Sequence, residues 1–570
     1  MKNRWILKSG GDPEIISGLS KELGVDNIIA SMLVQRGITT FNEARDFFRP
    51  SLQNLHDPFL MKDMDKAVTR LNTAIQNNEK ILVYGDYDVD GTTSVAMVYS
   101  FLKEFHRNID FYIPDRYTEG YGISFKSIDF ASDNDIDLIV ALDCGIKAND
   151  KIAFAREKNI DFIICDHHTP GNEIPEAVAV LDPKREDCGY PFKELSGCGV
   201  GFKLLQGLTN RNNLNEENLF QLLDLVAVSI ASDIVSISGE NRILASFGLK
   251  KLNENPRTGL KAMIKIAGME SKEIIVSDLV FKIGPRINAA GRIESGRSAV
   301  KLLIEEDELF AQELSAKINE HNEKRQSLDK TITEEALEMI KSNEDLQLRK
   351  STVLFNKEWH KGVIGIVASR LIENYYKPTV ILTESQGFAT GSARSVNGFD
   401  LYAAIEHCSD LLESFGGHKH AAGLTLKLGN LENFVNKFEE FVKINITEEQ
   451  QLPAITIDQK ISFAEITPKF FRIVNQFAPF GPGNMTPVYL TENVKNAGLS
   501  KIVGKTEEHL RLDLQDEKNY RMQGIAFFMS DYYQLVDKNQ SFNICYSIDE
   551  NEFNGKTSLQ LRVRDIHKSS

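Results

Sequence analysis

The feature that most constrains the fold is a regular alternation of short apolar runs and helix-like segments between residues 80 and 235. The apolar, strand-like runs lie at 81–85, 109–114, 137–143, 161–166 and 177–182. Helix-like segments, such as 92–105 and 149–159, lie between them. This alternation is typical of a parallel sheet with helices on both faces, so it predicts an α/β fold for this region.

Acidic and histidine side chains follow the carboxyl ends of these strands. They are Asp86, Asp88, Asp90, Asp143, Asp166, His167 and His168, and Asp233 closes a strongly apolar segment further along. A single Asp after a strand is most often a helix cap or a turn residue. Parallel strands, however, bring their ends to one edge, where clustered carboxylates raise one another's pKa unless a cation neutralises them. The set therefore predicts a metal site.

The type of metal follows from the type of ligand. The run at 86–91 begins like an EF-hand calcium loop, but Met97 stands where the twelfth-position glutamate belongs, and a strand precedes the loop. Carboxylates with one or two imidazoles suit Mn²⁺ or Mg²⁺ better than structural zinc. So many carboxylates favour two divalent ions about 3.5–4 Å apart, the arrangement used to hydrolyse phosphate esters.

Composition limits the class of protein. At 570 residues the chain predicts three or four domains, and its six cysteines form no C-x-x-C pair. The net charge of −15 argues against general adhesion to nucleic acid, so such a partner needs a local basic groove. The N-terminus has no signal-like apolar stretch, and Asp224 and Asp233 interrupt the most apolar segment. We therefore expect a cytoplasmic protein without a membrane partner.

Beyond residue 300 the pattern changes twice. A charged segment from about 305 to 343 has helical periodicity and predicts a long connecting helix, followed by a second α/β region. The final part, from about 453, alternates apolar and polar residues, as in "SLQLRVRDI". A strand of this kind with a basic outer row fits an oligonucleotide-binding barrel, and an ordinary solvated strand face explains this strand equally well. The glycines at 196–202 are interpreted as a turn that opens the next helix.

Several sequence blocks resemble a known superfamily. The blocks "GDYDVDGTTS", "ALDCGI", "CDHHTP" and "ASDIV" resemble the DHH phosphoesterase superfamily, whose name is the triplet Asp166-His167-His168. Further blocks are similar to its RecJ branch of single-strand-specific 5′-to-3′ exonucleases. These are "PDRYTEGYGIS", "FKIGPRINAAGRI", "EWHKGVIGIVASRL", "GSARS" and "FGGHKHAAG". The resemblance covers nearly the whole chain from about residue 50.

This resemblance implies a domain order. It comprises an N-terminal segment at 1–50, a parallel-sheet DHH catalytic domain at 51–300, and a connecting helix at 301–343. An α/β DHH-associated domain at 344–452 and an OB-like nucleic-acid-binding barrel at 453–570 follow. It also implies a metal-ligand set of Asp88, Asp90, Asp143, His167 and Asp233. Asp86, Asp166 and His168 complete the catalytic site as supporting, second-metal or proton-transfer groups.

The resemblance also implies residues that bind the DNA. The candidates for the phosphate at the 5′ end are Arg116, Arg286, Asn288, His360, Ser392, Arg394, Gly417 and His418. Arg394 and Ser392 offer a charged fork and a hydroxyl suited to phosphate oxygens, and a glycine lets the backbone approach a phosphate closely. In the barrel, Arg511, Arg562 and Arg564 are the candidates for contacts with the strand.

The predicted function is a metal-dependent exonuclease that releases mononucleotides from the 5′ end of single-stranded DNA in repair and recombination. We expect a monomer that works with a single-strand-binding protein and a RecQ-type helicase. One alternative is a DHH phosphodiesterase for short oligoribonucleotides or cyclic dinucleotides, against which the C-terminal barrel and the "GPRINAAGR" block count. The other is a non-catalytic DNA-binding scaffold, against which the complete set of ligand positions counts.

Overall fold

The computed structural model describes residues 3–537, 540–553 and 555–569. Its first sheet has five parallel strands in the order β3-β2-β4-β5-β6. Their bounds are β2 Ile81–Gly85, β3 Ile109–Tyr112, β4 Leu138–Leu142, β5 Asp161–Cys165 and β6 Ala179–Leu181. Each coincides with a predicted strand, and the α/β fold class is confirmed.

Helices cover both faces of this sheet, which is why its central strands are apolar along their whole length. One face packs against α4 (Met64–Gln76), α5 (Val89–Lys103) and α8 (Gly197–Asn212). The other face packs against α6 (Phe125–Asp133) and α7 (Asn149–Glu157). The apolar segment that Asp233 closes is the buried helix α10 (Leu223–Ser232). Among the described residues, no helix has the length and apolar character needed to cross a membrane.

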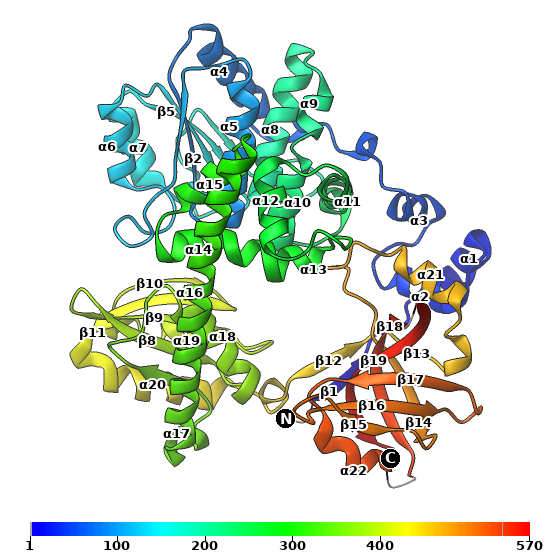
Figure 1. The fold of residues 1–570 in the computed structure, drawn as a ribbon. Helices are drawn as coiled ribbons and strands as arrows, with labels where there is room; N and C mark the ends of the chain where they lie inside the picture. Colours follow the sequence, from blue (N-terminus) through cyan, green and yellow to red (C-terminus); the bar gives the residue numbers. More distant parts are fainter. Residues whose placement is uncertain (1–2, 538–539, 554, 570) are drawn as a thin grey trace.

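More helices extend the domain beyond the sheet. They are α11 (Gly239–Glu254), α12 (Thr258–Ile266), α14 (Gly284–Ile293) and α15 (Gly296–Leu303). The predicted connecting helix is α16 (Glu308–Lys341), which begins where Asp307 accepts a hydrogen bond from the Phe310 N–H. Its first half packs on the catalytic domain and its second half on the next unit, so it joins the two (Figure 1).

The second α/β unit has a five-stranded sheet in the order β10-β11-β9-β8-β7. The strands are β7 Thr352–Phe355, β8 Thr379–Ser385, β9 Phe388–Arg394, β10 Leu412–His418 and β11 Ala421–Lys427. Only β7 and β8 pair in parallel; the other neighbours are antiparallel. Helices α18 (Ile364–Tyr375) and α20 (Leu431–Asn445) pack on this sheet, in the lower part of Figure 1.

The C-terminal unit is a seven-stranded sheet in the order β13-β14-β18-β19-β17-β16-β15. The strands are β13 Gln459–Lys460, β14 Tyr489–Asn496, β15 Lys501–Val503, β16 His509–Gln515, β17 Arg521–Ala526, β18 Phe542–Phe553 and β19 Lys556–Lys568. A further pairing between β14 and β16 closes the sheet into the predicted barrel. Leu561 and Val563 are buried while Arg562 and Arg564 are exposed, as the alternation predicts.

The N-terminal residues pack on the barrel, although the catalytic domain and the second α/β unit lie between the two in sequence. Strand β1 (Arg4–Leu7) pairs in parallel with β12 (Ala454–Ile457). Helices α1 (Pro13–Leu23) and α2 (Asn27–Val34) add side chains to the core of the barrel. We propose that these residues and the barrel fold as one unit. The domain boundaries stay predictions.

Candidate active site

The loop after β2 holds the aspartates of the first sequence block. Asp88 is the N-cap of α5, because its Oδ1 accepts the Gly91 N–H at 3.0 Å. The helix therefore begins at Val89, three residues before the predicted Thr92, and Asp90 lies in its first turn. This cap aims the carboxylate of Asp90 at the edge of the sheet instead of leaving it in a loop.

Asp90 is held by the N-terminus of another helix. Its two oxygens accept the N–H of Gly197 at 2.6 Å and of Cys198 at 2.8 Å, and Oδ1 also accepts the Ser229 hydroxyl at 2.7 Å. A Cβ at position 197 would lie 2.6 Å from that of Asp143, so only glycine fits between the two carboxylates. The glycines at 196–202 thus open α8 as interpreted, but the hydrogen bonds from the start of this helix to Asp90 were not predicted. A glycine run at a helix start is the signal for it.

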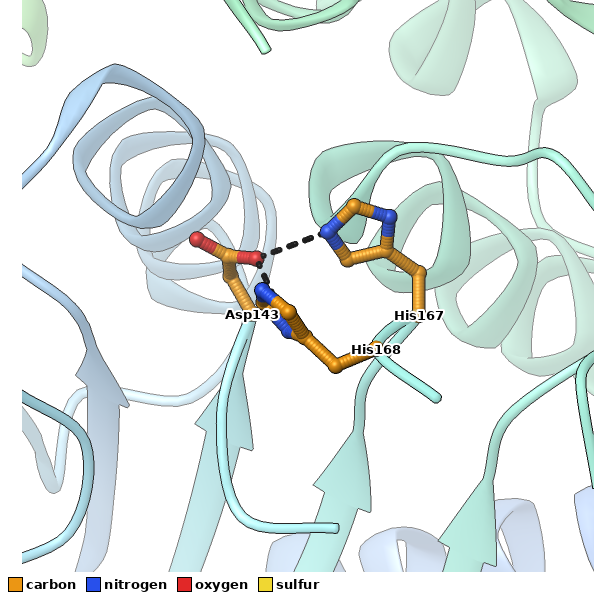
Figure 2. A group of neighbouring side chains, drawn as sticks. All are labelled: Asp143, His167 and His168. Carbon is orange, nitrogen blue, oxygen red and sulfur yellow. Dashed lines mark ion pairs between the residues drawn. The ribbon is translucent and has the colours of Figure 1, made fainter. Parts of the chain in front are cut away.

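His167 lies at the centre of the predicted metal site. Its Nε2 is 3.2 Å from Oδ1 of Asp143, 3.5 Å from Oδ2 of Asp233 and 3.7 Å from Oδ2 of Asp90. These residues form two groups with metal-ligand geometry, and both contain His167: one adds Asp143 and His168, the other Asp90 and Asp233. Figure 2 shows the first group, with both histidines pointing at Asp143 beyond the strand ends. The fold thus gathers four of the five predicted ligands.

The site carries polar atoms that lack protein partners. Among the described residues, the buried atoms Asp86 Oδ2, Asp143 Oδ1, His167 Nδ1, His167 Nε2 and Asp233 Oδ2 accept or donate no hydrogen bond. Burial raises the pKa of Asp143 well above its usual range, and the charges of Asp90 and Asp88 add to the rise. Burial and Asp90 do the same for Asp233. Because divalent cations would satisfy these atoms and relieve the repulsion, the residues present fit a metal centre.

Asp166 serves His168 rather than the centre of the site. Its Oδ1 accepts His168 Nδ1 at 2.7 Å and the His167 N–H at 2.7 Å, and its Oδ2 accepts the Ile146 N–H at 2.9 Å. Burial alone would raise the pKa of Asp166, but the hydrogen bond and charge of His168 lower it well below its usual range. On the far side of the ring, the Tyr121 hydroxyl lies 3.1 Å from His168 Nε2. Tyr121 was not predicted.

Asp86 and Asp88 flank the two ligand groups without belonging to either. Asp86 is fully buried and accepts the Tyr87 N–H at 2.6 Å. Burial raises the pKa of Asp86 well above its usual range, and the charge of Asp88 adds to it. Burial also raises the pKa of Asp88, against the hydrogen bond from Gly91, and Asp90 adds to the rise. Their predicted roles as supporting group and ligand stay predictions.

A cluster of arginines adjoins the metal site. The guanidinium of Arg116 lies 4.9 Å from the ring centre of Tyr87. Tyr87 itself stands between Asp86 and Asp88 in the sequence. On β9, Arg394 donates to the Ser392 hydroxyl at 3.0 Å, so the predicted fork and hydroxyl do lie together. The charge of Arg116 also lowers the pKa of Arg394, after the larger effect of burial. These residues therefore share one region, although they come from two domains.

Two further arginines were missed by the sequence analysis. Burial lowers the pKa of Arg292 to about 9, and the nearby charges of Arg116, Arg325 and Arg394 contribute. Arg292 donates to the Gly362 carbonyl at 2.8 Å, which joins the catalytic domain to the second unit. In the part of the chain that the structure describes, no carboxylate lies within 4.0 Å of Arg116, Arg292, Arg325 or Arg394. The signal was present in the "GPRINAAGRI" block, whose second arginine lies six residues after Arg286.

The remaining predicted phosphate residues lie on α14, in the loop before α18 and at the end of β10. Arg286 and Asn288 lie on α14, where Arg286 donates to Asn319 Oδ1 at 3.0 Å. His360 lies in the loop before α18 and accepts the Gly362 N–H at 3.1 Å. Gly417 and His418 end β10. Burial lowers the pKa of His418, as do the charges of His420, Arg394 and His168, so this strand end approaches both the arginines and the metal site.

The three barrel arginines lie apart from this region. Arg511 lies on β16, and Arg562 and Arg564 lie on β19, and all three side chains are exposed. Both strands belong to the C-terminal unit (Figure 1). They share the barrel surface but no contact with the metal site. Their contacts with DNA stay a prediction.

Three family models match successive parts of the chain. The N-terminal domain of the DHH family matches residues 80–230, the DHHA1 domain matches 349–444, and the RecJ OB domain matches 457–565. Their order is the order of the three folded units described above.

Curated relatives match over nearly the full chain. The single-stranded-DNA-specific exonuclease RecJ of Bacillus subtilis is 36% identical, over 99% of this chain and 71% of its own length. The protein of the same name from Dickeya dadantii is 30% identical, over 95% of this chain and 96% of its own length.

Solved structures agree with these relatives. RecJ from Thermus thermophilus in complex with Mn²⁺ has a TM-score of 0.86 at 26% identity, and covers 100% of this chain and 80% of its own. The same protein with Mg²⁺ has a TM-score of 0.80 at 25% identity, and covers 100% of this chain and 79% of its own.

Proposed function

Because the chain belongs to the RecJ family of single-stranded-DNA-specific exonucleases, we propose that it hydrolyses single-stranded DNA. It would cleave phosphodiester bonds from the 5′ end and release 5′-mononucleotides. The observation that carries this proposal is the pair of ligand groups that share His167 at the strand ends. A phosphodiesterase needs such a centre, and the alternative of a non-catalytic DNA-binding scaffold does not.

Two divalent ions, Mn²⁺ or Mg²⁺, suit this centre. Asp90, Asp143, His167 and Asp233 would hold them, with Asp88 and His168 beside them. When bound, such ions activate water for attack on phosphorus and neutralise the charge that develops on its oxygens. The chain's own residues orient the site: the N-terminus of α8 holds Asp90, and Asp166 holds His168.

The arginine cluster supports action at a chain end. Four guanidiniums without carboxylate partners among the described residues form a site for a strongly anionic group, and a terminal phosphate carries more negative charge than an internal one. Arg116 and Arg394, with Ser392, would bind that phosphate while the adjacent bond lies at the metal centre. In this proposal, the approach of the DNA strand to that phosphate site would be lined by Arg286, Asn288, His360, Gly417 and His418. An end-binding pocket of this kind makes the enzyme an exonuclease.

The cellular setting is also a proposal. An acidic chain meets free DNA slowly in moderate salt, so a partner that delivers the strand is expected. We propose a monomer in the cytoplasm that acts in DNA repair and recombination, with a single-strand-binding protein and a RecQ-type helicase as partners.

The test is product analysis on 5′-phosphorylated oligonucleotides of matched sequence: single-stranded DNA, duplex DNA and single-stranded RNA. Each is incubated with Mn²⁺, Mg²⁺ or EDTA, for the wild type and for Asp143→Ala. We expect mononucleotides from the 5′ end of single-stranded DNA, only with metal and only from the wild type. Preference for very short RNA would instead favour an oligoribonuclease. No cleavage of any substrate would favour a scaffold.

A further inference from the structure

The segment that follows α10 is strained. Asp233, one of the residues gathered at the metal site, is the C-cap of α10, and its N–H donates to the Ser229 carbonyl at 2.9 Å. Ile234 comes next with a φ of 62°, in the left-handed region, and is 70% exposed. A β-branched residue rarely adopts this conformation, because its Cβ crowds the backbone. It persists only where the surrounding structure holds the chain in place.

The barrel unit holds this segment further along. A turn at residues 481–483, here called the barrel turn, lies just before β14, and its Pro482 carbonyl accepts the Ile237 N–H at 2.7 Å. The Ile237 side chain is fully buried in the core of the catalytic domain. The hydrogen bond therefore ties the loop that follows Asp233 to a turn of the C-terminal unit.

The barrel turn fits closely against this loop at two glycines. A Cβ at Gly481 would overlap Ile237 Cδ1, and a Cβ at Gly483 would overlap Ser236 Oγ. Gly483 also has a φ of 73°, so both its conformation and its surroundings require glycine. The loop at 236–237 consequently has no room to move toward the barrel turn.

The barrel turn is itself held in place. The backbones of Gly481 and Asn484 exchange two hydrogen bonds, at 3.0 and 2.9 Å. The buried Asn484 side chain donates to the carbonyls of Phe477 at 2.7 Å and Pro479 at 2.9 Å, and its Oδ1 accepts Arg36 Nε at 2.8 Å. A turn whose polar groups are satisfied in this way offers a fixed support to the loop that it contacts.

Asp233 depends on its backbone for its place in the metal site. The carboxylate of Asp90 accepts three hydrogen bonds, whereas Oδ2 of Asp233 is buried without a hydrogen-bond partner among the described residues. This oxygen lies 3.5 Å from Nε2 of His167, the residue that both ligand groups share. A shift of the backbone at residue 233 would therefore move a ligand atom that no hydrogen bond in the described chain restrains.

We propose that the barrel turn positions Asp233 for metal binding. Pro482 and Gly483 fix the backbone at 236–237, and the strained Ile234 leaves little freedom to absorb a displacement before it reaches Asp233. The inference rests on the metal centre of the proposed function, and it makes the C-terminal unit a support of that centre. Groups that orient a metal ligand typically change metal affinity about 10–100-fold when they are altered.

Gly483→Ala tests this inference, because the added methyl group presses on Ser236 Oγ. Mn²⁺ affinity is measured by calorimetric titration without substrate. The nuclease rate is measured against Mn²⁺ concentration, and KM for a 5′-phosphorylated oligonucleotide is measured at saturating Mn²⁺. We expect the Mn²⁺ dissociation constant and the half-activating Mn²⁺ concentration each to rise about tenfold, with KM unchanged. Much of the lost rate should return at saturating Mn²⁺, which a general loss of structure would not allow.

Gly498→Ala is the matched control. Gly498 also lies in the C-terminal unit, with a φ of 111°, but a Cβ there would meet no atom within 4 Å. This variant carries backbone strain without the contact, so it should bind Mn²⁺ as the wild type does. The double variant Ser236→Ala/Gly483→Ala should recover most of the affinity relative to Ser236→Ala, because the nearest atom of residue 236 is then its Cβ, at 3.3 Å.

Thermal melts in EDTA check that each variant folds. If Gly483→Ala does not fold, Gly481→Ala takes its place, because it presses only on the flexible end of Ile237, and it should weaken Mn²⁺ binding in the same direction. Wild-type Mn²⁺ affinity in the folded glycine variant would overturn the inference, as would an equal loss in Gly498→Ala or no recovery in the double variant. A wild type that binds no Mn²⁺ would overturn the metal centre itself, and the inference with it.

Discussion

Asp143 combines two unfavourable features in one residue. Its φ is 59°, in the left-handed region, and its Oδ1 is buried without a hydrogen-bond donor among the described residues. Aspartate and asparagine tolerate this backbone conformation better than most residues, so the backbone explains the residue type but not the charge. The charge is explained by a cation. Asp143 therefore lowers the stability of the metal-free protein, and metal binding offsets that loss.

We expect Asp143→Asn to separate the two features. Asparagine keeps the shape and the left-handed preference but removes the carboxyl whose pKa is raised by burial and by the charges of Asp90 and Asp88. The metal-free variant should melt at or above the wild-type temperature, gain less from Mn²⁺, and lose more than about 100-fold in nuclease rate. Thermal melts with and without Mn²⁺, alongside rates, test this. A variant stabilised by Mn²⁺ as strongly as the wild type would remove Asp143 from the ligand set.

The pH dependence of the metal-free protein follows from His168. Burial alone would lower its pKa, but the hydrogen bond and charge of Asp166 outweigh burial and raise the pKa to about 9. A raised histidine pKa contributes stability that is present below about pH 6.5 and is lost as the pH rises through about 9. Over that pH window we expect the free energy of unfolding to fall by about 1 kcal/mol. This figure is smaller than the full pKa shift implies, because the His168 side chain is 43% exposed and solvent screens its charge.

Urea denaturation in EDTA, at about pH 6.5 and about pH 9.5 on either side of the window, measures this loss. The raised pKa values of Asp143 and Asp233 act in the same direction, because deprotonation charges them in a buried site. His168→Gln should therefore reduce the pH dependence without abolishing it. An unchanged dependence in the variant would show that protonated His168 contributes nothing to folding.

At the scale of elements, the β10–β11 hairpin positions residues on the second unit. Gly417 has a φ of 143°, and a Cβ there would lie 2.3 Å from the Ala421 carbonyl oxygen of the paired strand. Gly416, the preceding residue, has open space around such a Cβ. The two glycines therefore form a matched pair for substitution.

We expect Gly417→Ala to destabilise the protein by about 1–3 kcal/mol and to lower kcat/KM at least about tenfold, because the hairpin that carries His418 must shift. Gly416→Ala should leave both values near the wild type. Urea denaturation and initial rates on a 5′-phosphorylated oligonucleotide give the two readouts. Equal effects of the two substitutions would mean that the backbone at Gly417 has no special role.

At the scale of the whole molecule, Arg242 of α11 joins the catalytic domain to the barrel unit. Its guanidinium donates to the carbonyls of Phe47 at 3.0 Å, Phe477 at 2.8 Å and Ala478 at 2.8 Å. It also stacks on the ring of Phe47, at 3.8 Å from the ring centre. One buried side chain therefore donates hydrogen bonds to carbonyls of both the N-terminal segment and the segment that leads into the barrel.

We expect Arg242→Lys to weaken this joint, because lysine cannot replace a planar fork with several donors. The free energy of unfolding should fall by about 2–3 kcal/mol, because carbonyls are left without a hydrogen-bond donor. The two tryptophans report separate units: Trp5 packs on the barrel and Trp359 on the second α/β unit. Their fluorescence transitions in urea should coincide in the wild type and diverge in the variant. Arg211→Lys, at an exposed pair with Asp65, is the control.

The sequence by itself determined the alternating α/β pattern, the acidic strand ends, the long helix and the basic outer row of the last strand. Each of these rests on local periodicity or on a short block, because side-chain spacing within a strand or helix does not depend on distant residues. The family resemblance added candidate residues, and the fold brings together Asp90, Asp143, His167 and Asp233.

Only the tertiary structure decided what connects these pieces. Gly197 and Ser229 hold Asp90 from more than a hundred residues away, Arg292 meets Gly362 across two domains, and β1 pairs with β12. The rings of His509 and Phe528 likewise meet only when β16 and β17 pair. The physical reason is that such contacts join residues far apart in the chain or on neighbouring strands. Their geometry comes from how whole elements pack, which no local pattern encodes.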